Sequence, residues 1–181
     1  TRTGIKERRL LKEEGKGTSY LGIKAAEDLI QKIDLDPTTI DLVIFATATP
    51  DMPVASSGAY LASQIGAKNA FSYDLQAACS SFLYGMSTAA SYVQSGRYKK
   101  VLLVGADKMS SIIDYTDRAT CIIFGDGGGA VLFEPNEDGL GLQDEILRSD
   151  GIGREFLKID AGGSILPASE ETVANKQHFV Q

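Results

Sequence analysis

The residue whose type and position best suit covalent chemistry is Cys79, one of two cysteines in the sequence. It lies in DLQAACSSFLYGM, where a predicted strand gives way to a predicted helix, and small residues surround it. Small neighbours let a substrate approach the sulfur, and the free amide groups at a helix start favour the thiolate form. An exposed helix end contributes only about 0.3–1 kcal/mol, so a base or further directed amide groups must complete the activation. A buried structural cysteine is the alternative interpretation, and the local pattern leaves both open.

Two other features invite a chemical interpretation. Residues 124–130 read FGDGGGA, but this run lacks the Lys and Ser/Thr of a phosphate-binding Walker motif, and its glycines precede a predicted strand instead of opening a helix. We therefore interpret these glycines as allowing a close backbone approach near an active site. His178 is the only histidine, and its position between extended stretches favours a surface or packing role over catalysis.

The elements that must position Cys79 follow from the apolar periodicity. It predicts helices at 18–33, 56–65 and 79–95 and strands at 41–49, 70–75 and 100–107. Thr18 or Ser19 is the expected cap of the first helix, and Gly66 and Gly96 are expected to end the next two. This order predicts an α/β fold, with a mostly parallel sheet and helices on both faces. The glycine run should feed another strand, with residues 140–148 as its hairpin partner.

Composition narrows the class of protein. The 181 residues are 43% apolar and 23% charged, which suits one packed domain. The net charge of −6 argues against nucleic acid as a partner. No apolar run approaches the roughly 18–20 residues that cross a bilayer, and no secretory signal or metal-ligand spacing is present, so we expect a cytoplasmic protein without a membrane partner or metal. The chain begins at Thr1 and ends at Gln181 after an apolar pair, which we interpret as cuts through a longer protein.

Several motifs together resemble one family. TRTGIKERR, DLQAACSSFLYGM, VLLVGADKMS, DYTDRAT and IIFGDGGGAVLF occur in the order and spacing found in β-ketoacyl-acyl-carrier-protein synthase III, a condensing enzyme of the thiolase fold. The resemblance implies that residues 1–150 form a thiolase-like amino-terminal half, truncated at its start. Residues 151–181 would then form the crossover towards a second half. It also implies a homodimer that condenses acetyl-CoA, or another short acyl-CoA, with malonyl-acyl carrier protein to start a fatty acid chain.

The resemblance also assigns residues. Cys79 matches the acyl-accepting nucleophile, Arg118 the arginine that stacks on the coenzyme A adenine, and Arg2 an arginine near the coenzyme A phosphates. Coenzyme A is a substrate in that family, so no cofactor is expected. Met52 lies near the residue that closes the partner's acyl pocket, and Phe82 suits either an acyl tunnel or the core. The family's catalytic histidine and asparagine lie in the second half, and His178 does not match that histidine, so the 181-residue chain alone is expected not to condense.

Three alternatives remain open at this point. A type III polyketide synthase, a hydroxymethylglutaryl-CoA synthase or a long-chain condensing enzyme shares a cysteine on the same helix. A nucleotide-binding module would use the glycine run instead. A non-catalytic homologue would carry an inert Cys79 and serve as a scaffold or dimer partner.

Overall fold

Residues 4–181 are described by a computed structural model, and they divide into two compact units. The larger unit comprises residues 12–108 and 127–147, and the smaller one residues 4–11, 109–126 and 148–181. Within residues 4–181, no helix is both long and apolar enough to cross a membrane. The predicted division at residue 150 stays a prediction.

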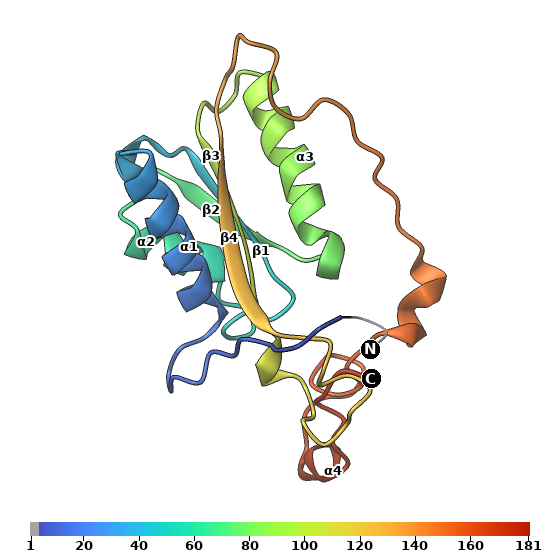
Figure 1. Cartoon of the computed structure of the whole chain (residues 1–181). Coiled ribbons are helices and arrows are strands. Elements are labelled where there is room, and N and C mark those ends of the chain that lie inside the picture. Colours follow the sequence, from blue (N-terminus) through green and yellow to red (C-terminus); the bar gives the residue numbers. More distant parts are fainter. Residues whose placement is uncertain (1–3) are drawn as a thin grey trace. The chain divides into compact units, whose positions relative to one another are not determined.

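A four-stranded sheet forms the centre of the larger unit. Its strands are β1 (Leu42–Ala46), β2 (Phe71–Leu75), β3 (Val101–Lys108) and β4 (Asp126–Phe133), in the order β2-β1-β3-β4 (Figure 1). β1 pairs in parallel with both β2 and β3, so that Ile44 lies opposite Tyr73 on one side and Leu103 on the other. The predicted α/β fold with a mostly parallel sheet is thereby confirmed.

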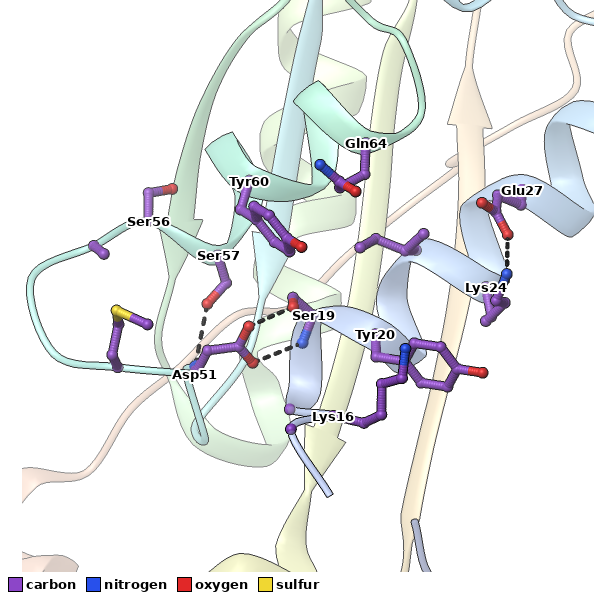
Figure 2. Close-up of a pocket in the computed structure, with 15 residues that line it drawn as sticks. Lys16, Ser19, Tyr20, Lys24, Glu27, Asp51, Ser56, Ser57, Tyr60 and Gln64 are labelled. Carbon is purple, nitrogen blue, oxygen red and sulfur yellow. Dashed lines mark hydrogen bonds and ion pairs between the residues drawn. The ribbon is translucent and has the colours of Figure 1, made fainter. Parts of the chain in front are cut away.

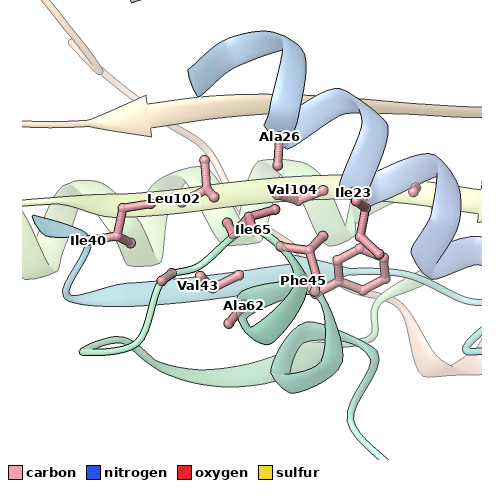
Figure 3. Packing of buried hydrophobic residues seen from close by; sticks show 12 residues of the cluster. Ile23, Ala26, Ile40, Val43, Phe45, Ala62, Ile65, Leu102 and Val104 are labelled. Carbon is pink, nitrogen blue, oxygen red and sulfur yellow. The ribbon is translucent and has the colours of Figure 1, made fainter. Parts of the chain in front are cut away.

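Helices cover both faces of this sheet (Figure 1). They are α1 (Thr18–Lys32) and α2 (Ser57–Gln64) on one face and α3 (Ser81–Gln94) on the other. Side chains along β1 alternate between two apolar clusters. Val43 and Phe45 join the cluster beneath α1 and α2 (Figure 3), and Leu42 and Ile44 join the cluster beneath α3. All four are fully buried, which explains why the sequence of this strand is an unbroken apolar run.

The predicted helix boundaries agree with the structure to within a few residues, but the predicted cap of α1 is wrong. Gly66 and Gly96 follow their helices with φ of +81° and +70°, in the left-handed conformation that glycine adopts readily. The cap residue of α1 is Gly17, and no local side chain caps the helix. Thr18 and Ser19 are buried instead, because their hydroxyls bond to Thr49 and Asp51 after β1. The Asp51 carboxylate, in the segment after β1, therefore accepts the Ser19 N–H in the first turn of α1.

The predicted hairpin partner of β4 is also wrong. Residues 140–148 contain no strand. Gly139 and Gly141 have φ of +72° and +116°, which turns the chain away from an extended path. Leu140 and Ile146 remain exposed, so the apolar residues of this segment gain nothing from pairing with β4.

The smaller unit is mostly irregular and is held by backbone contacts between its segments. It contains the short helices η3 (Met109–Ser111), η4 (Gly151–Phe156) and α4 (Glu170–Ala174), the last with a capping box from Ser169 and Thr172. The N–H of Val180 donates to the carbonyl of Ile112 at 2.9 Å. This bond links the end of the chain to the loop that follows η3.

Candidate functional site

Cys79 lies in a short turn that joins the end of β2 to the start of α3. The turn is a single 3-10 helix, η2 (Ala78–Ser80), so α3 itself begins at Ser81, slightly later than predicted. Ala78 has φ of +47°, a conformation that costs a residue with a Cβ roughly 1–2 kcal/mol. A strained strand-to-helix turn of this kind is how a nucleophile is raised clear of the surrounding backbone.

Ser81 holds this turn from inside. Its side chain is buried, and its Oγ accepts the N–H of Ala77 at 2.6 Å. The N–H of Ser80 donates to the carbonyl of Ala77 at 3.1 Å. These two bonds close the backbone around Cys79 and offset the strain at Ala78.

The Cys79 thiol is exposed, which argues against the buried structural cysteine. Ala78 beside it is exposed as well, so small residues leave the sulfur accessible to a substrate. The first turn of α3 contains no acidic residue, and no side chain caps it. The amide groups at the start of this 14-residue helix therefore present unopposed partial positive charge near Cys79.

Phe82, the other residue assigned to this helix, packs in the core. It joins the apolar cluster between α3 and the sheet, together with Met86 and the strand residue Leu103. The packing alternative therefore accounts for its position. A role in an acyl tunnel remains a prediction.

Aspartates at the carboxyl ends of the strands fix the loops around this edge of the sheet. Asp74 in β2 accepts the N–H groups of Ser57 and Gly58 at 2.8 Å each and so caps α2. Asp107 in β3 uses Oδ1 to accept the N–H groups of Ala48 and Thr49 at 2.8 and 3.1 Å. These bonds tie the segment after β1 and the start of α2 to the edge of the sheet that carries the Cys79 turn. For Asp107 the available sequence signal was a charged residue near the end of a buried strand.

A hollow of about 640 Å³ lies between α1, α2 and the segment that follows β1 (Figure 2). Met52 contributes to its lining, as do Tyr20 of α1 and Tyr60 of α2. The Lys16 ammonium lies 4.5 Å from the centre of the Tyr20 ring. The predicted role of Met52 in a partner's acyl pocket remains a prediction.

Arg118 lies in the smaller unit, on an exposed loop. Asp114 and Asp117 shape that loop by accepting bonds from residues two and three positions further on: the Oδ1 of Asp114 binds the Thr116 N–H at 2.8 Å, and the Oδ2 of Asp117 binds the Thr120 hydroxyl at 2.7 Å. Arg118 is exposed, and among residues 4–181 its guanidinium makes no hydrogen bond or ion pair. Cys79 and Arg118 belong to different units.

The remaining candidates have simpler outcomes. Arg2 lies outside the described residues. The Nε2 of His178 lies 3.0 Å from the Thr172 hydroxyl, next to the capping box of α4, which suits a packing role. The glycines 127–129 lie within β4, and a Cβ on Gly128 would approach the Leu21 carbonyl oxygen to 3.0 Å. Gly128 therefore serves a close approach to α1, whereas a Cβ on Gly127 or Gly129 would meet no atom within 4 Å. The glycines form part of a strand and not a phosphate loop. Within residues 4–181, no cluster of three or more potential metal ligands occurs.

Comparison with known proteins places these features in a family context. The family model for 3-oxoacyl-[acyl-carrier-protein] synthase III matches residues 73–151, which include both Cys79 and Arg118. The β-ketoacyl-[acyl-carrier-protein] synthase III 2 of Bacteroides thetaiotaomicron is 56% identical over 180 residues, covering 99% of this chain and 54% of the relative. The enzyme of that name from Chlorobium chlorochromatii is 54% identical over 182 residues, covering 99% and 55%. The chain thus spans about half the length of the curated relatives it matches.

Solved structures agree with the sequence comparison. The crystal structure of β-ketoacyl-[acyl-carrier-protein] synthase III from Thermus thermophilus has a TM-score of 0.81 and 38% identity, over 93% of this chain and 51% of that one. The similarity extends across both units of the chain. It supports the thiolase-like fold that the motifs implied.

Proposed function

The chain belongs, as a part, to the β-ketoacyl-[acyl-carrier-protein] synthase III family, and on that premise we propose that Cys79 accepts an acyl group from coenzyme A and passes it to malonyl-acyl carrier protein. The observation that carries this proposal is the exposed Cys79 thiol on a strained turn at the amino end of α3. The reaction would initiate fatty acid synthesis. The alternatives of a polyketide or long-chain condensing enzyme are not favoured, because the curated relatives that are 48–56% identical to this chain carry the name β-ketoacyl-[acyl-carrier-protein] synthase III.

In the first half-reaction, the Cys79 thiolate attacks the thioester carbonyl of acetyl-CoA or another short acyl-CoA. The carbonyl oxygen becomes an oxyanion, and the backbone N–H of Cys79 would donate a hydrogen bond to it. The bond to the coenzyme A sulfur then breaks, and coenzyme A leaves as the thiolate. The products are acyl-Cys79 and free coenzyme A.

In the second half-reaction, malonyl-acyl carrier protein loses carbon dioxide, and the resulting carbanion attacks the acyl-Cys79 carbonyl. The sulfur of Cys79 is the leaving group and returns to the thiolate. Negative charge on the malonyl thioester oxygen needs directed donors, which family members take from a histidine and an asparagine. His178 is engaged with Thr172 and does not match that histidine, so we propose that the 181-residue chain alone does not condense.

Arg118 would bind the coenzyme A end of the substrate. Its guanidinium is planar and always charged, so it can stack on adenine in a way that an ammonium group cannot. Arg2 would contact the coenzyme A phosphates. We further propose a cytoplasmic homodimer with no resident cofactor.

The experiment that tests the acyl-transfer proposal is mass spectrometry of the protein expressed at the length of its curated relatives, called the extended protein below. After incubation with acetyl-CoA, one acetyl adduct should appear on the peptide that contains Cys79. The adduct should disappear in Cys79→Ala and persist in Cys121→Ala, the matched control at the other cysteine. An extended protein that folds and binds coenzyme A but forms no adduct at Cys79 would contradict the proposal.

A further inference from the structure

Lys176 contacts the loop that carries Arg118, from a position far along the chain. Its Nζ donates to the Oδ2 of Asp114 at 2.8 Å and to the Thr116 hydroxyl at 2.9 Å. Both partners come shortly before Arg118, and Asp114 also binds the Thr116 hydroxyl with its Oδ1 at 2.7 Å. The lysine, the aspartate and the threonine therefore form a closed triangle of polar contacts at the base of the loop.

The backbone around Lys176 is arranged for this contact. Lys176 has φ of +58°, a conformation that disfavours a residue with a Cβ and is kept only where surrounding contacts determine it. The preceding helix α4 ends at Ala174, and the N–H of Lys176 donates to the Val173 carbonyl at 3.0 Å. Four residues later, the Val180 N–H binds the Ile112 carbonyl at 2.9 Å. The chain from Lys176 to Val180 is thus attached to the Arg118 loop at both ends of that short stretch.

The exposure of the two side chains shows whether the contact between Lys176 and Asp114 mainly stabilises the fold or mainly selects a loop conformation. The Asp114 side chain is 18% exposed and that of Lys176 56% exposed. A half-exposed ion pair of this kind adds little to the stability of a fold. It can still select one conformation of a loop, because the two hydrogen bonds are charge-assisted and converge on neighbouring residues.

We propose that Lys176 is a positioning residue that holds the Arg118 guanidinium in the orientation for binding the nucleotide end of coenzyme A. This inference rests on the proposed function of Arg118. Lys176 acts through Asp114 and Thr116, since two of its three ammonium donors are used there. Its effect should therefore be confined to substrates that carry the nucleotide.

The test compares two acyl donors in the extended protein: acetyl-CoA and acetyl-pantetheine, which has the same thioester arm without the nucleotide. Lys176→Met keeps the length of the side chain and removes the charge. We expect the KM for acetyl-CoA in acyl transfer to Cys79 to rise about twofold to fivefold with little change in kcat. The KM for acetyl-pantetheine should stay unchanged. Lys158→Met is the matched control, because Lys158 lies in the same unit and pairs with Glu155 at 2.7 Å.

A double-mutant cycle distinguishes action through Arg118 from any direct role. On an Arg118→Ala background, Lys176→Met should add nothing further to the KM for acetyl-CoA. The proposal would be overturned if Lys176→Met raised the KM for acetyl-CoA equally on the Arg118→Ala background, or raised the KM for acetyl-pantetheine equally. It would also be overturned if Lys176→Met left the KM for acetyl-CoA unchanged. If Lys176→Met does not fold, Asp114→Asn removes the same ion pair and should give the same selective rise. Failure of the proposed function is separate, since it would show as no acetyl-Cys79 in the unmodified protein.

Discussion

The backbone N–H of Ala77 and the Oγ of Ser81 lie 2.6 Å apart, across the turn that presents Cys79. The hydroxyl thus acts as an internal brace for a backbone that includes the left-handed Ala78. Without it, the Ala77 amide has no acceptor within the turn. The brace is a property of the serine side chain, so it can be removed without touching the thiol.

Ser81→Ala should therefore reduce the reactivity of Cys79. Loss of one hydrogen bond that fixes the turn corresponds to a rate lower by about twofold to tenfold. The measurement is the rate of alkylation of Cys79 by iodoacetamide in the extended protein. The Cys121→Ser substitution is included so that Cys79 is the one thiol of residues 1–181 that can react. Ser80→Ala is the matched control, because Ser80 lies beside Cys79 and only its backbone N–H, which the substitution keeps, binds Ala77. Equal rates for both variants would show that the Ser81 hydroxyl has no influence on the reactivity of Cys79.

Asp107→Ala should destabilise the fold well beyond the loss of a surface charge. The Asp107 Oδ1 accepts from the hydroxyls of Thr47 and Thr49 at 3.0 and 2.9 Å, in addition to two backbone amides. Removing the carboxylate leaves these donors without their acceptor, and we expect the free energy of unfolding to fall by at least about 2 kcal/mol. Asp107→Asn keeps one acceptor oxygen and should cost less. Urea denaturation measures both, and equal losses for the two variants would contradict this account.

Gly22→Ala should destabilise α1 even though alanine favours helices. A Cβ at Gly22 would lie 2.4 Å from Cε2 of Phe45, whose ring is fully buried. Overpacking of about 1–3 kcal/mol outweighs a helix-propensity gain of at most about 1 kcal/mol. Gly129→Ala is the matched control, since a Cβ there meets no atom within 4 Å. Thermal unfolding should show a lower Tm for Gly22→Ala alone, and a Phe45→Leu background should reduce the difference.

The contact between Lys176 and Asp114 should show a defined pH dependence. Hydrogen bonds from Lys176 and Thr116 lower the pKa of Asp114 from 3.8 to about 2. The ionised carboxylate therefore adds a small stabilisation to the folded state, weakened by solvent screening, that is present above pH 3.8 and is lost as the pH falls through about 2. The Tm difference between the unmodified extended protein and Asp114→Asn should be constant near neutral pH and narrow below about pH 4. For Lys176→Met, which removes the cation instead, the Tm difference from the unmodified protein should narrow over the same pH range. A Tm difference that stays constant down to pH 2 would contradict the lowered pKa of Asp114.

The sequence predicted those parts of the fold that depend on local patterns. The strand β1 (Leu42–Ala46) is apolar because both of its faces are covered, and the turn at Cys79 follows from a strand that meets a helix. Gly66 ends α2 because its positive φ is a conformation that glycine adopts readily. Each of these features is marked in the sequence by residues that are neighbours in the chain.

The features that the sequence did not predict depend on partners far along the chain. Asp51 binds the amide of Ser19 across 32 residues, and Lys176 binds Asp114 across 62. No periodicity or motif marks such pairs, because each consists of an ordinary polar residue whose partner is set by the fold. The hairpin predicted at 140–148 failed for the opposite reason. Its local pattern suited a strand, but no sheet edge buries its side chains.

The long-range cap on α1 links two events in the assembly of the chain. The Asp51 carboxylate binds both the N–H and the hydroxyl of Ser19, so the first turn of α1 is complete only when the segment after β1 has reached its place. A synthetic peptide of residues 12–33 should therefore be frayed at its beginning in water. The start of α1 thus depends on a residue outside the helix, and formation of its first turn would indicate that β1 and the segment after it have packed against α1.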